Sequence, residues 1–200
     1  LTQEGIRGNE EFPDATHNTI LPFTRMINGA ADYTICYYRQ DFGRLNADKD
    51  SYGVPRSKSI QTTPAHQLAL AAVYYSPLQY MYWYDKPSDS QDEPELKFFD
   101  DVYTTWDDTK VLQGEVGEFI TIARRKGEEW FIGSITNNEK RVLSVSLDFL
   151  PEGKNYIAEI YTDGDKSVKT RTKVRVSTYR VSNKTKLNFC LKASGGGQFV

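Results

Sequence analysis

Short segments in which apolar and polar residues alternate fill the second half of the chain and predict β-strands. The segments are GEFITIARRKGEEWFIGSITN, KRVLSVSLDFL, NYIAEIYTDG, KTRTKVRVSTYRV and TKLNFCLKASGGGQF. Turn residues at Lys126-Gly127 and at Thr162–Asp165 interrupt this pattern, as in β-hairpins. Several short strands at such regular spacing predict an antiparallel β-sandwich. The run Gly195–Gly197 near the end is interpreted as a low-complexity tail.

The first half has a mixed pattern. The segment TTPAHQLALAAVYYSP predicts a helix, because Thr62 or Thr63 is a favourable cap and Pro64 suits the first helical position. The aromatic and β-branched runs YTICYYRQ (33–40) and LQYMYWYD (78–85) predict strands on either side of it. A helix that leads into a buried strand is half of a β-α unit, which predicts the end of an α/β barrel or of a doubly wound sheet. A complete barrel takes about 250 residues, so this half cannot close one.

A polar stretch rich in proline and serine, Lys86–Glu95, lies between the two patterns and is typical of a connection between domains. Two hundred residues are enough for one medium domain or two small ones. The predicted fold class is therefore α/β plus all-β. The α/β part is expected at residues 1–92 and the all-β part at residues 93–200.

Composition and charge exclude several classes of partner. The chain is 38% hydrophobic and 26% charged, which is ordinary for a soluble globular protein. Its 27 acidic and 25 basic residues are spread along the chain, so no basic stripe indicates binding to nucleic acid or to an anionic membrane. No apolar run approaches the roughly 20 residues that a membrane span needs. A neutral or small partner is expected, and the aromatic share of 13% suits a sugar-stacking surface or an aromatic core.

The opening stretch LTQEGIRGNEEF is the first candidate for chemistry. Glu4 and Glu10 flank a turn that contains glycine, and glycine lets the backbone fold tightly enough to bring two carboxylates together. Such a pair binds a hard cation such as Ca²⁺ through oxygen, or separates its pKa values so that one carboxyl is a general acid at neutral pH. The competing interpretation is a solvated acidic loop.

Further polar residues have two interpretations each. His17, with Asn18 beside it, is either a hydrogen-bonded structural residue or a contact to a sugar hydroxyl. Arg25 is suited to pair with a buried carboxylate or to orient a catalytic one. His66, inside the predicted helix, is expected to be a buried or half-buried, hydrogen-bonded structural residue. The basic run Arg124–Lys126 is expected to be a solvated turn rather than a binding patch.

Three linked motifs resemble the C-terminal third of glycoside hydrolase family 97: EGIRGNEEF, HNTILPFTRMINGAADYT and TTPAHQLALAAVYYSPLQYMYW. This family consists of calcium-dependent α-glycosidases common in Bacteroides-type gut bacteria. The resemblance implies that residues 1–92 are the C-terminal portion of a catalytic (β/α)8 barrel. It also implies that residues 93–200 are a β-sandwich associated with oligomerisation, in a periplasmic or secreted enzyme whose signal is not in this chain.

Carried over residue by residue, the resemblance assigns roles to the opening loop. Glu4 is expected to hold Ca²⁺, and Glu10 is expected to be the general acid, or acid/base, and a second ligand of the metal. His17, Asn18 and Arg25 are the expected contacts to the oligosaccharide. A carboxyl that gives its proton to the glycosidic oxygen suits the oxocarbenium-like transition state of glycoside hydrolysis.

The second carboxylate that such an enzyme needs is expected upstream, so the 200-residue piece alone is expected to be inactive. The family contains retaining α-galactosidases and inverting α-glucosidases. The segments DATHNT and ADYTICYY resemble the retaining branch more closely than the inverting one. This resemblance favours terminal α-linked galactose over glucose as the substrate. The alternative hypothesis is a non-enzymatic β-sandwich module that binds carbohydrate or assembles copies of the chain.

Overall fold

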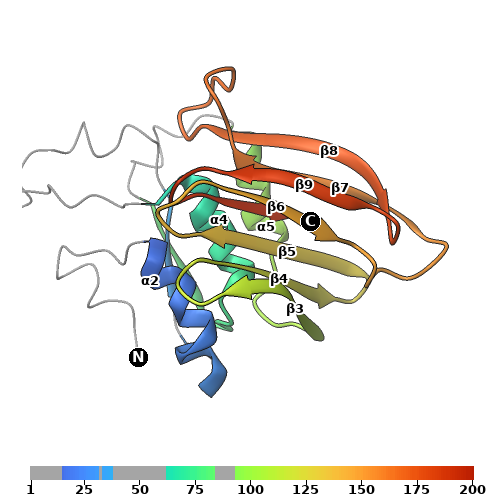
Figure 1. Ribbon diagram of the computed structural model, residues 1–200, viewed down its shortest axis with the longest axis horizontal. Helices are drawn as coiled ribbons and strands as arrows, with labels where there is room; N and C mark the ends of the chain where they lie inside the picture. The colour runs from blue at the N-terminus through green and yellow to red at the C-terminus, as the bar shows by residue number, and fades with distance from the viewer. Residues whose placement is uncertain (1–14, 32, 38–61, 84–92) are drawn as a thin grey trace, which may run out of the picture.

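The computed structural model describes residues 15–31, 33–37, 62–83 and 93–200 (Figure 1). These residues form three layers, with a six-stranded antiparallel sheet in the middle, helices on one face and a two-stranded sheet on the other. The predicted β-sandwich is confirmed, although its two sheets are unequal in size. Within the described ranges, no helix has the length and apolar character needed to cross a membrane.

The central sheet has the strand order β3-β4-β5-β10-β7-β8. Its strands are β3 (Asp108–Glu115), β4 (Phe119–Lys126), β5 (Glu129–Thr136), β7 (Asn155–Asp163), β8 (Val174–Ser182) and β10 (Gly196–Phe199). The outer sheet pairs β6 (Arg141–Ser146) with β9 (Lys186–Leu191). The last strand of the chain therefore lies inside the large sheet, antiparallel to both β5 and β7.

The prediction of a low-complexity tail at Gly195–Gly197 is wrong, because this run leads into β10. A side chain at Gly196 has no room, since its Cβ would lie 2.5 Å from His66 Cα. Gly133 on β5 is equally tight, with its Cβ position 2.7 Å from the carbonyl oxygen of Ala69. The two glycines let the backbone of a helix lie closer to the sheet than any side chain would permit.

That helix is α4 (Pro64–Val73), which begins as the sequence predicts. The Thr63 hydroxyl accepts a hydrogen bond from the His66 N–H at 3.2 Å, and Pro64 takes the first position. Every residue of α4 is buried, as expected for a helix that is apolar around its whole circumference. It contacts the central sheet and also the parallel strands β1 (Tyr33–Tyr37) and β2 (Gln79–Trp83), the latter through a hydrogen bond from Gln79 to the Ala71 carbonyl oxygen.

The order β1-α4-β2 is one β-α-β unit, as predicted for the first half. Its pairing is in register, with Tyr33 opposite Gln79 and Tyr37 opposite Trp83. The two strands are the only ones that the structure describes before residue 93, so the (β/α)8 barrel stays a prediction.

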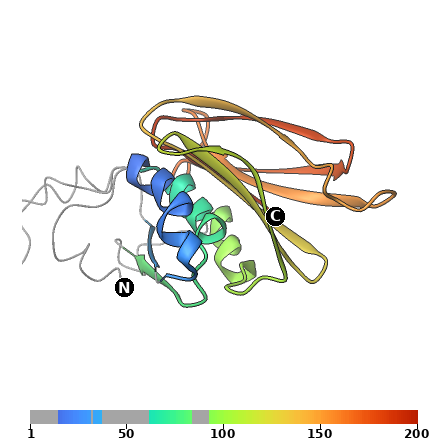
Figure 2. The ribbon, with the colours of Figure 1, turned by 60° about the horizontal axis from the view of Figure 1, so that its bottom comes forward.

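Further short helices lie with α4 on the same face of the central sheet (Figure 2). They are α2 (Ala15–Ile20), η1 (Leu21–Phe23), η2 (Arg25–Asn28), η4 (Pro94–Leu96) and α5 (Lys97–Asp101). The Phe98 ring lies 5.7 Å from that of Tyr161 on β7, and the Phe99 ring lies 5.2 Å from that of Tyr37 on β1. Residues before and after the predicted domain boundary at 92/93 thus share one hydrophobic core, while the boundary itself stays a prediction.

The expectation of a solvated turn is wrong for Arg124, whose exposed fraction is 5%. Alternate residues of a strand point to opposite faces, and Arg124 points to the helical side of β4. Its guanidinium donates to the carbonyl oxygens of Ala72 and Val73, the latter at 3.1 Å, and burial lowers its pKa to about 10. These carbonyls belong to the last turn of α4, where helical partners are missing and a positive charge is favoured.

Replacing Gly196 by alanine should lower the free energy of unfolding by about 1–3 kcal/mol, the usual cost of overfilling a packed core. The reason is that the added Cβ meets backbone atoms of α4, which cannot move aside singly. Gly197→Ala is the matched control, because its Cβ would face the side chains of Thr162 and Leu191 at 3.3 and 3.5 Å. Urea unfolding of the intact protein measures both variants, and equal losses would contradict the close docking of α4.

Candidate functional site

The predicted site residues fall partly inside the described ranges. Glu4 and Glu10 lie outside the described residues, and α2 follows them in sequence. On α2, His17 is exposed to solvent whereas Asn18 is buried, with an exposed fraction of 1%. The two neighbours therefore point into different environments, and only Asn18 takes part in the core.

Asn18 is the middle of a buried hydrogen-bond chain. Its Nδ2 lies 3.0 Å from His66 Nε2, and its Oδ1 accepts from the Tyr74 hydroxyl at 3.1 Å. His66 lies on α4, and Tyr74 directly follows this helix. The amide of Asn18 thus holds α2 against α4, and its contact with a sugar stays a prediction.

His66 joins this chain to the sandwich, because its Nδ1 lies 3.1 Å from the carbonyl oxygen of Gly195. A carbonyl only accepts, so Nδ1 carries the proton and Nε2 accepts from Asn18. Burial lowers the pKa of His66 to about 4, against the opposing effect of the Gly195 carbonyl. The expected structural role of His66 is confirmed, and the imidazole is neutral near pH 7.

The turn before β10 also holds the first residues of α4. The Thr63 N–H donates to the carbonyl oxygen of Ser194 at 3.0 Å. Asp163 Oδ2, at the end of β7, accepts from the backbone N–H groups of Lys192 at 3.0 Å and of Gly196 at 3.2 Å. The sandwich therefore holds the start of α4, and both α4 and strand β5 hold α2.

Arg25 closes its own loop rather than reaching across the structure. Its two terminal nitrogens donate to the carbonyl oxygens of Gly29 at 3.3 Å and Ala30 at 3.0 Å. These bonds shape the segment between η2 and β1. The contacts of His17 and Arg25 with substrate stay predictions.

A second buried polar cluster lies at the carboxyl end of β1, and the sequence analysis missed it. The Tyr37 hydroxyl donates to Glu95 Oε1 at 2.7 Å, and the Thr172 hydroxyl donates to the same oxygen. Burial, followed by the neighbouring Glu95 carboxylate, raises the pKa of Tyr37 well above its usual value, so the phenol remains protonated. Glu95 was missed because it lies in a polar stretch that resembles a linker.

The predicted calcium site lies outside the described residues. Among them, no group of three or more His, Cys, Asp or Glu side chains is placed to hold a metal ion. The two expected ligands, Glu4 and Glu10, lie outside that part of the chain. The Ca²⁺ site accordingly stays a prediction.

Comparison with known proteins assigns the chain to a family. Residues 105–200 match the family model described as the glycosyl-hydrolase 97 C-terminal, oligomerisation domain. Over 205 aligned positions the chain is 32% identical to a retaining alpha-galactosidase of Bacteroides thetaiotaomicron, an alignment that covers 98% of this chain. The chain belongs to glycoside hydrolase family 97. It spans 30% of the length of that relative.

The chain is also similar to a second sequence relative and to two solved structures. A probable retaining alpha-galactosidase of Streptomyces bingchenggensis is 32% identical over 136 residues, which cover 66% of this chain and 19% of that protein. A family 97 enzyme from Pseudoalteromonas sp. strain K8, solved in complex with acarbose, has a TM-score of 0.80 and 30% identity, covering 99% of this chain and 30% of its own. A beta-arabinopyranosidase at 23% identity and a TM-score of 0.70 shares the fold.

Acidification should destabilise this family 97 chain through His66. The unfolded chain takes up a proton near pH 6.5, whereas the folded chain does so only near pH 4. The stability that the protein gains from keeping His66 neutral is therefore fully present above pH 6.5 and is lost as the pH falls to 4. The loss amounts to about 3 kcal/mol, at about 1.4 kcal/mol per pKa unit.

The measurement is urea unfolding of the intact protein between pH 7 and pH 4, beside His66→Gln. Glutamine does not titrate, and other acidic and basic groups contribute equally to both proteins. The variant should be less stable at pH 7, and the difference should narrow as the pH falls. A difference that stays constant over this range would show that His66 is not held neutral by the fold.

Proposed function

We propose that this chain is part of an exo-acting, retaining α-galactosidase that removes terminal α-linked galactose from oligosaccharides. The observation that carries the proposal is the 32% identity with a retaining alpha-galactosidase across 98% of the chain. The similarity extends over nearly the whole chain. It therefore supports a shared activity more strongly than similarity confined to the β-sandwich would. An inverting α-glucosidase is the second candidate, since family members of both kinds resemble the opening motifs.

In this proposal Glu10 is the acid/base. It gives a proton to the glycosidic oxygen as that bond breaks, while a carboxylate from another part of the protein attacks the anomeric carbon from the opposite side. Glu10 then takes a proton from the water that releases the sugar. Retention requires the two carboxyl groups to lie about 5–5.5 Å apart, so the loop that bears Glu10 must be placed accurately.

The described residues support this requirement by holding the segment that follows the loop. Asn18 is tied to His66 and Tyr74, and His66 is tied to the Gly195 carbonyl. A helix as short as α2 is not stable alone, so its position depends on these bonds and on its direct contacts with β5. Residues that carry no chemistry thereby help to position the acid.

Calcium, assembly and location complete the proposal. Glu4 and Glu10 supply carboxylate oxygens, the ligands that Ca²⁺ prefers, and the bound ion would orient sugar hydroxyls. Residues 105–200 would join copies of the protein, in line with the oligomerisation role in the description of the matching family model. The oligosaccharide substrate favours a periplasmic or secreted enzyme.

Glu10→Gln in the intact protein should slow substrates with poor leaving groups far more than activated aryl galactosides. An amide cannot donate the proton that an alkoxide leaving group needs, whereas a nitrophenolate leaves without it. The expected loss of kcat/KM is about 10²–10⁴-fold for a natural disaccharide and much smaller for p-nitrophenyl α-galactoside.

The matched control is Glu11→Gln, the neighbouring carboxylate, which should leave both activities close to those of the wild type. Equal losses on both substrates would remove Glu10 from the role of acid. NMR of the first-formed anomer distinguishes the candidates, because α-galactose indicates retention and a β-sugar from an α-glucoside indicates the inverting alternative. Absence of hydrolysis in the intact protein would favour the non-enzymatic module.

Removal of calcium should abolish turnover without unfolding the sandwich. The described residues contain no metal cluster, so the fold of residues 105–200 should not depend on the ion. Dialysis against a calcium chelator, followed by circular dichroism and an activity assay, separates the two effects. Activity that survives exhaustive chelation, or fails to return on adding Ca²⁺, would contradict the metal site.

A further inference from the structure

The two edges of the central sheet differ in how they are protected against pairing with another strand. The edge strand β3 has a break in its register between Val111 and Gln113. It also carries charged side chains along its length, at Asp108, Lys110 and Glu115. Bulges and charges are common means by which proteins keep an edge strand from pairing. β3 is therefore a protected edge.

The other edge strand, β8, has no bulge and no proline. It pairs with β7 without interruption from Val174 to Ser182, over nine residues. Among the described residues no strand lies along its outer side, and Figure 1 shows it at the margin of the sheet. Its only charged residues are Arg175 and Arg180. Such a strand presents a row of backbone N–H and C=O groups that can pair with a second strand.

The middle of β8 is open to solvent on both faces of the sheet. Thr178 lies opposite Glu159 of β7, on the face that the helices cover, and Arg180 points to the same face. Tyr179 points to the face of the outer sheet, and its exposed fraction is 55%. Thr178 and Arg180 are exposed as well. Neither the helices nor the outer sheet therefore blocks the approach of a strand at this point.

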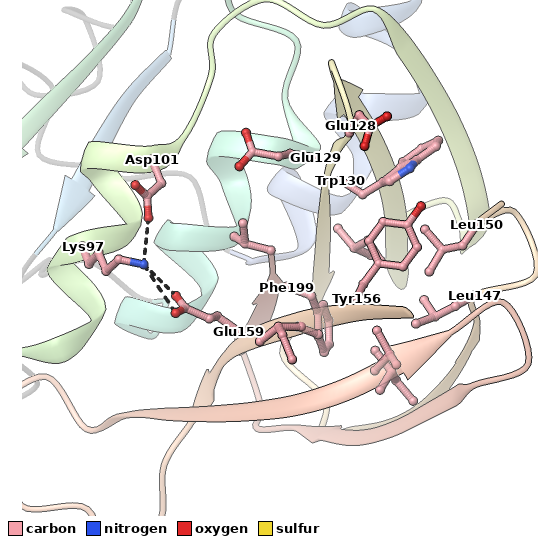
Figure 3. Close-up of a pocket in the computed structure, with 16 residues that line it drawn as sticks. Lys97, Asp101, Glu128, Glu129, Trp130, Leu147, Leu150, Tyr156, Glu159 and Phe199 are labelled. Atoms are coloured by element: carbon pink, nitrogen blue, oxygen red, sulfur yellow. Dashed lines mark hydrogen bonds and ion pairs between the residues drawn. The ribbon is translucent and has the colours of Figure 1, made fainter. Parts of the chain in front are cut away.

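The charges next to this stretch favour a cation from outside. Lys97 pairs with Asp101 at 3.2 Å and with Glu159 at 3.3 Å, and Figure 3 shows the three side chains together. Two carboxylates and one ammonium leave this trio with a net negative charge. Arg180 forms no ion pair with any residue that the structure describes. Each copy of the chain thus offers both an unpaired cation and a net negative group on one face.

The sequence of β8 restricts how it can pair with itself. Like charges directly opposite each other on neighbouring strands are destabilising, which disfavours registers that place Arg180 opposite Arg180 or Arg175. A two-fold axis at Tyr179 avoids these contacts. It places the two Tyr179 rings opposite each other, a favourable aromatic pair. It also places Arg180 opposite Thr178 of the second copy, a small residue next to Glu159 of that copy.

We propose that β8 pairs in an antiparallel manner with β8 of a second copy of the chain, about a two-fold axis at Tyr179. Residues 176–182 of the two copies exchange backbone hydrogen bonds, and the central sheet continues from one copy into the other. A second copy is the occupant because this strand is complementary to itself and because the matching family model is described by oligomerisation. The pairing rests on the assembly part of the proposed function and not on the glycosidase part.

Tyr179→Lys in the intact protein should raise the dissociation constant of the dimer roughly tenfold or more, because two ammonium groups then face each other at the axis. Sedimentation equilibrium over a dilution series measures this constant. The matched control is Val111→Lys on β3, a site with an exposed fraction of 64%. It adds the same charge at the protected edge, and its dimer should dissociate as that of the wild type does.

A disulfide tests the position of the axis without relying on the lysine variant. Opposite residues of antiparallel strands have Cα atoms about 4.5–5.5 Å apart, which a disulfide can span. Tyr179→Cys should therefore form a covalent dimer on oxidation of the intact protein. Cys190 is exposed and is replaced by serine in this background. Val111→Cys in the same background should stay monomeric on a non-reducing gel.

The possible failures separate the two proposals. An intact wild-type protein that sediments as a monomer at every concentration of the series would overturn both the β8 pairing and the proposed assembly. If the wild type is a dimer and Tyr179→Lys dissociates as Val111→Lys does, the pairing is wrong but assembly through another surface stands. If Tyr179→Cys forms no covalent dimer, the two-fold axis at Tyr179 is wrong.

Discussion

The arrangement of the described residues depends on how closely the backbone of α4 lies against the central sheet. Glycines at 133 and 196 leave the space for that approach, since a Cβ at either position would lie within 2.7 Å of helix backbone atoms. The ends of α4 are then held by polar groups of the sandwich. Ser194 accepts from the first turn, and Arg124 donates to the last. One helix is thus fixed along its whole length by the sheet.

This contact has a consequence for the proposed chemistry. His66 is hydrogen-bonded to the Gly195 carbonyl oxygen, which precedes β10, and to Asn18 of α2. These two bonds link the position of α2 to that of the sheet. Under the proposed function, the loop that precedes α2 carries the acid and the calcium ligands. The C-terminal sandwich of a family 97 enzyme would then support catalysis as well as assembly, because Asn18 of α2 is bonded through His66 to Gly195 and α2 also contacts β5.

The sequence predicted the elements better than their order in space. The cap at Thr63, the apolar circumference of α4 and the alternation along β4, β5 and β7 are local signals, and each element is present. The place of β10 between β5 and β7 depends on pairing between distant segments, which no local pattern encodes. For the same reason a run of glycines was interpreted as a tail.

The candidate site was predictable only in part. His66 was expected to be structural because it lies inside an apolar helix, and its contacts agree. Arg124 and Glu95 were missed, since a charged residue in a turn-like or linker-like stretch gives no sign of burial. The roles of Glu4 and Glu10 rest on resemblance and on the family, because neither composition nor spacing distinguishes a catalytic pair from an acidic loop.

The most direct test of the account is native-state hydrogen exchange of the intact protein in increasing urea. Because α4 and the central sheet form one core, the amides of 67–73 and those of β5 and β10 should open with the same free energy. Their exchange curves should merge as urea rises. If the amides of α4 open at a much lower free energy while the sheet remains protected, the helix is an accessory to a sandwich that is stable without it, and the account is wrong.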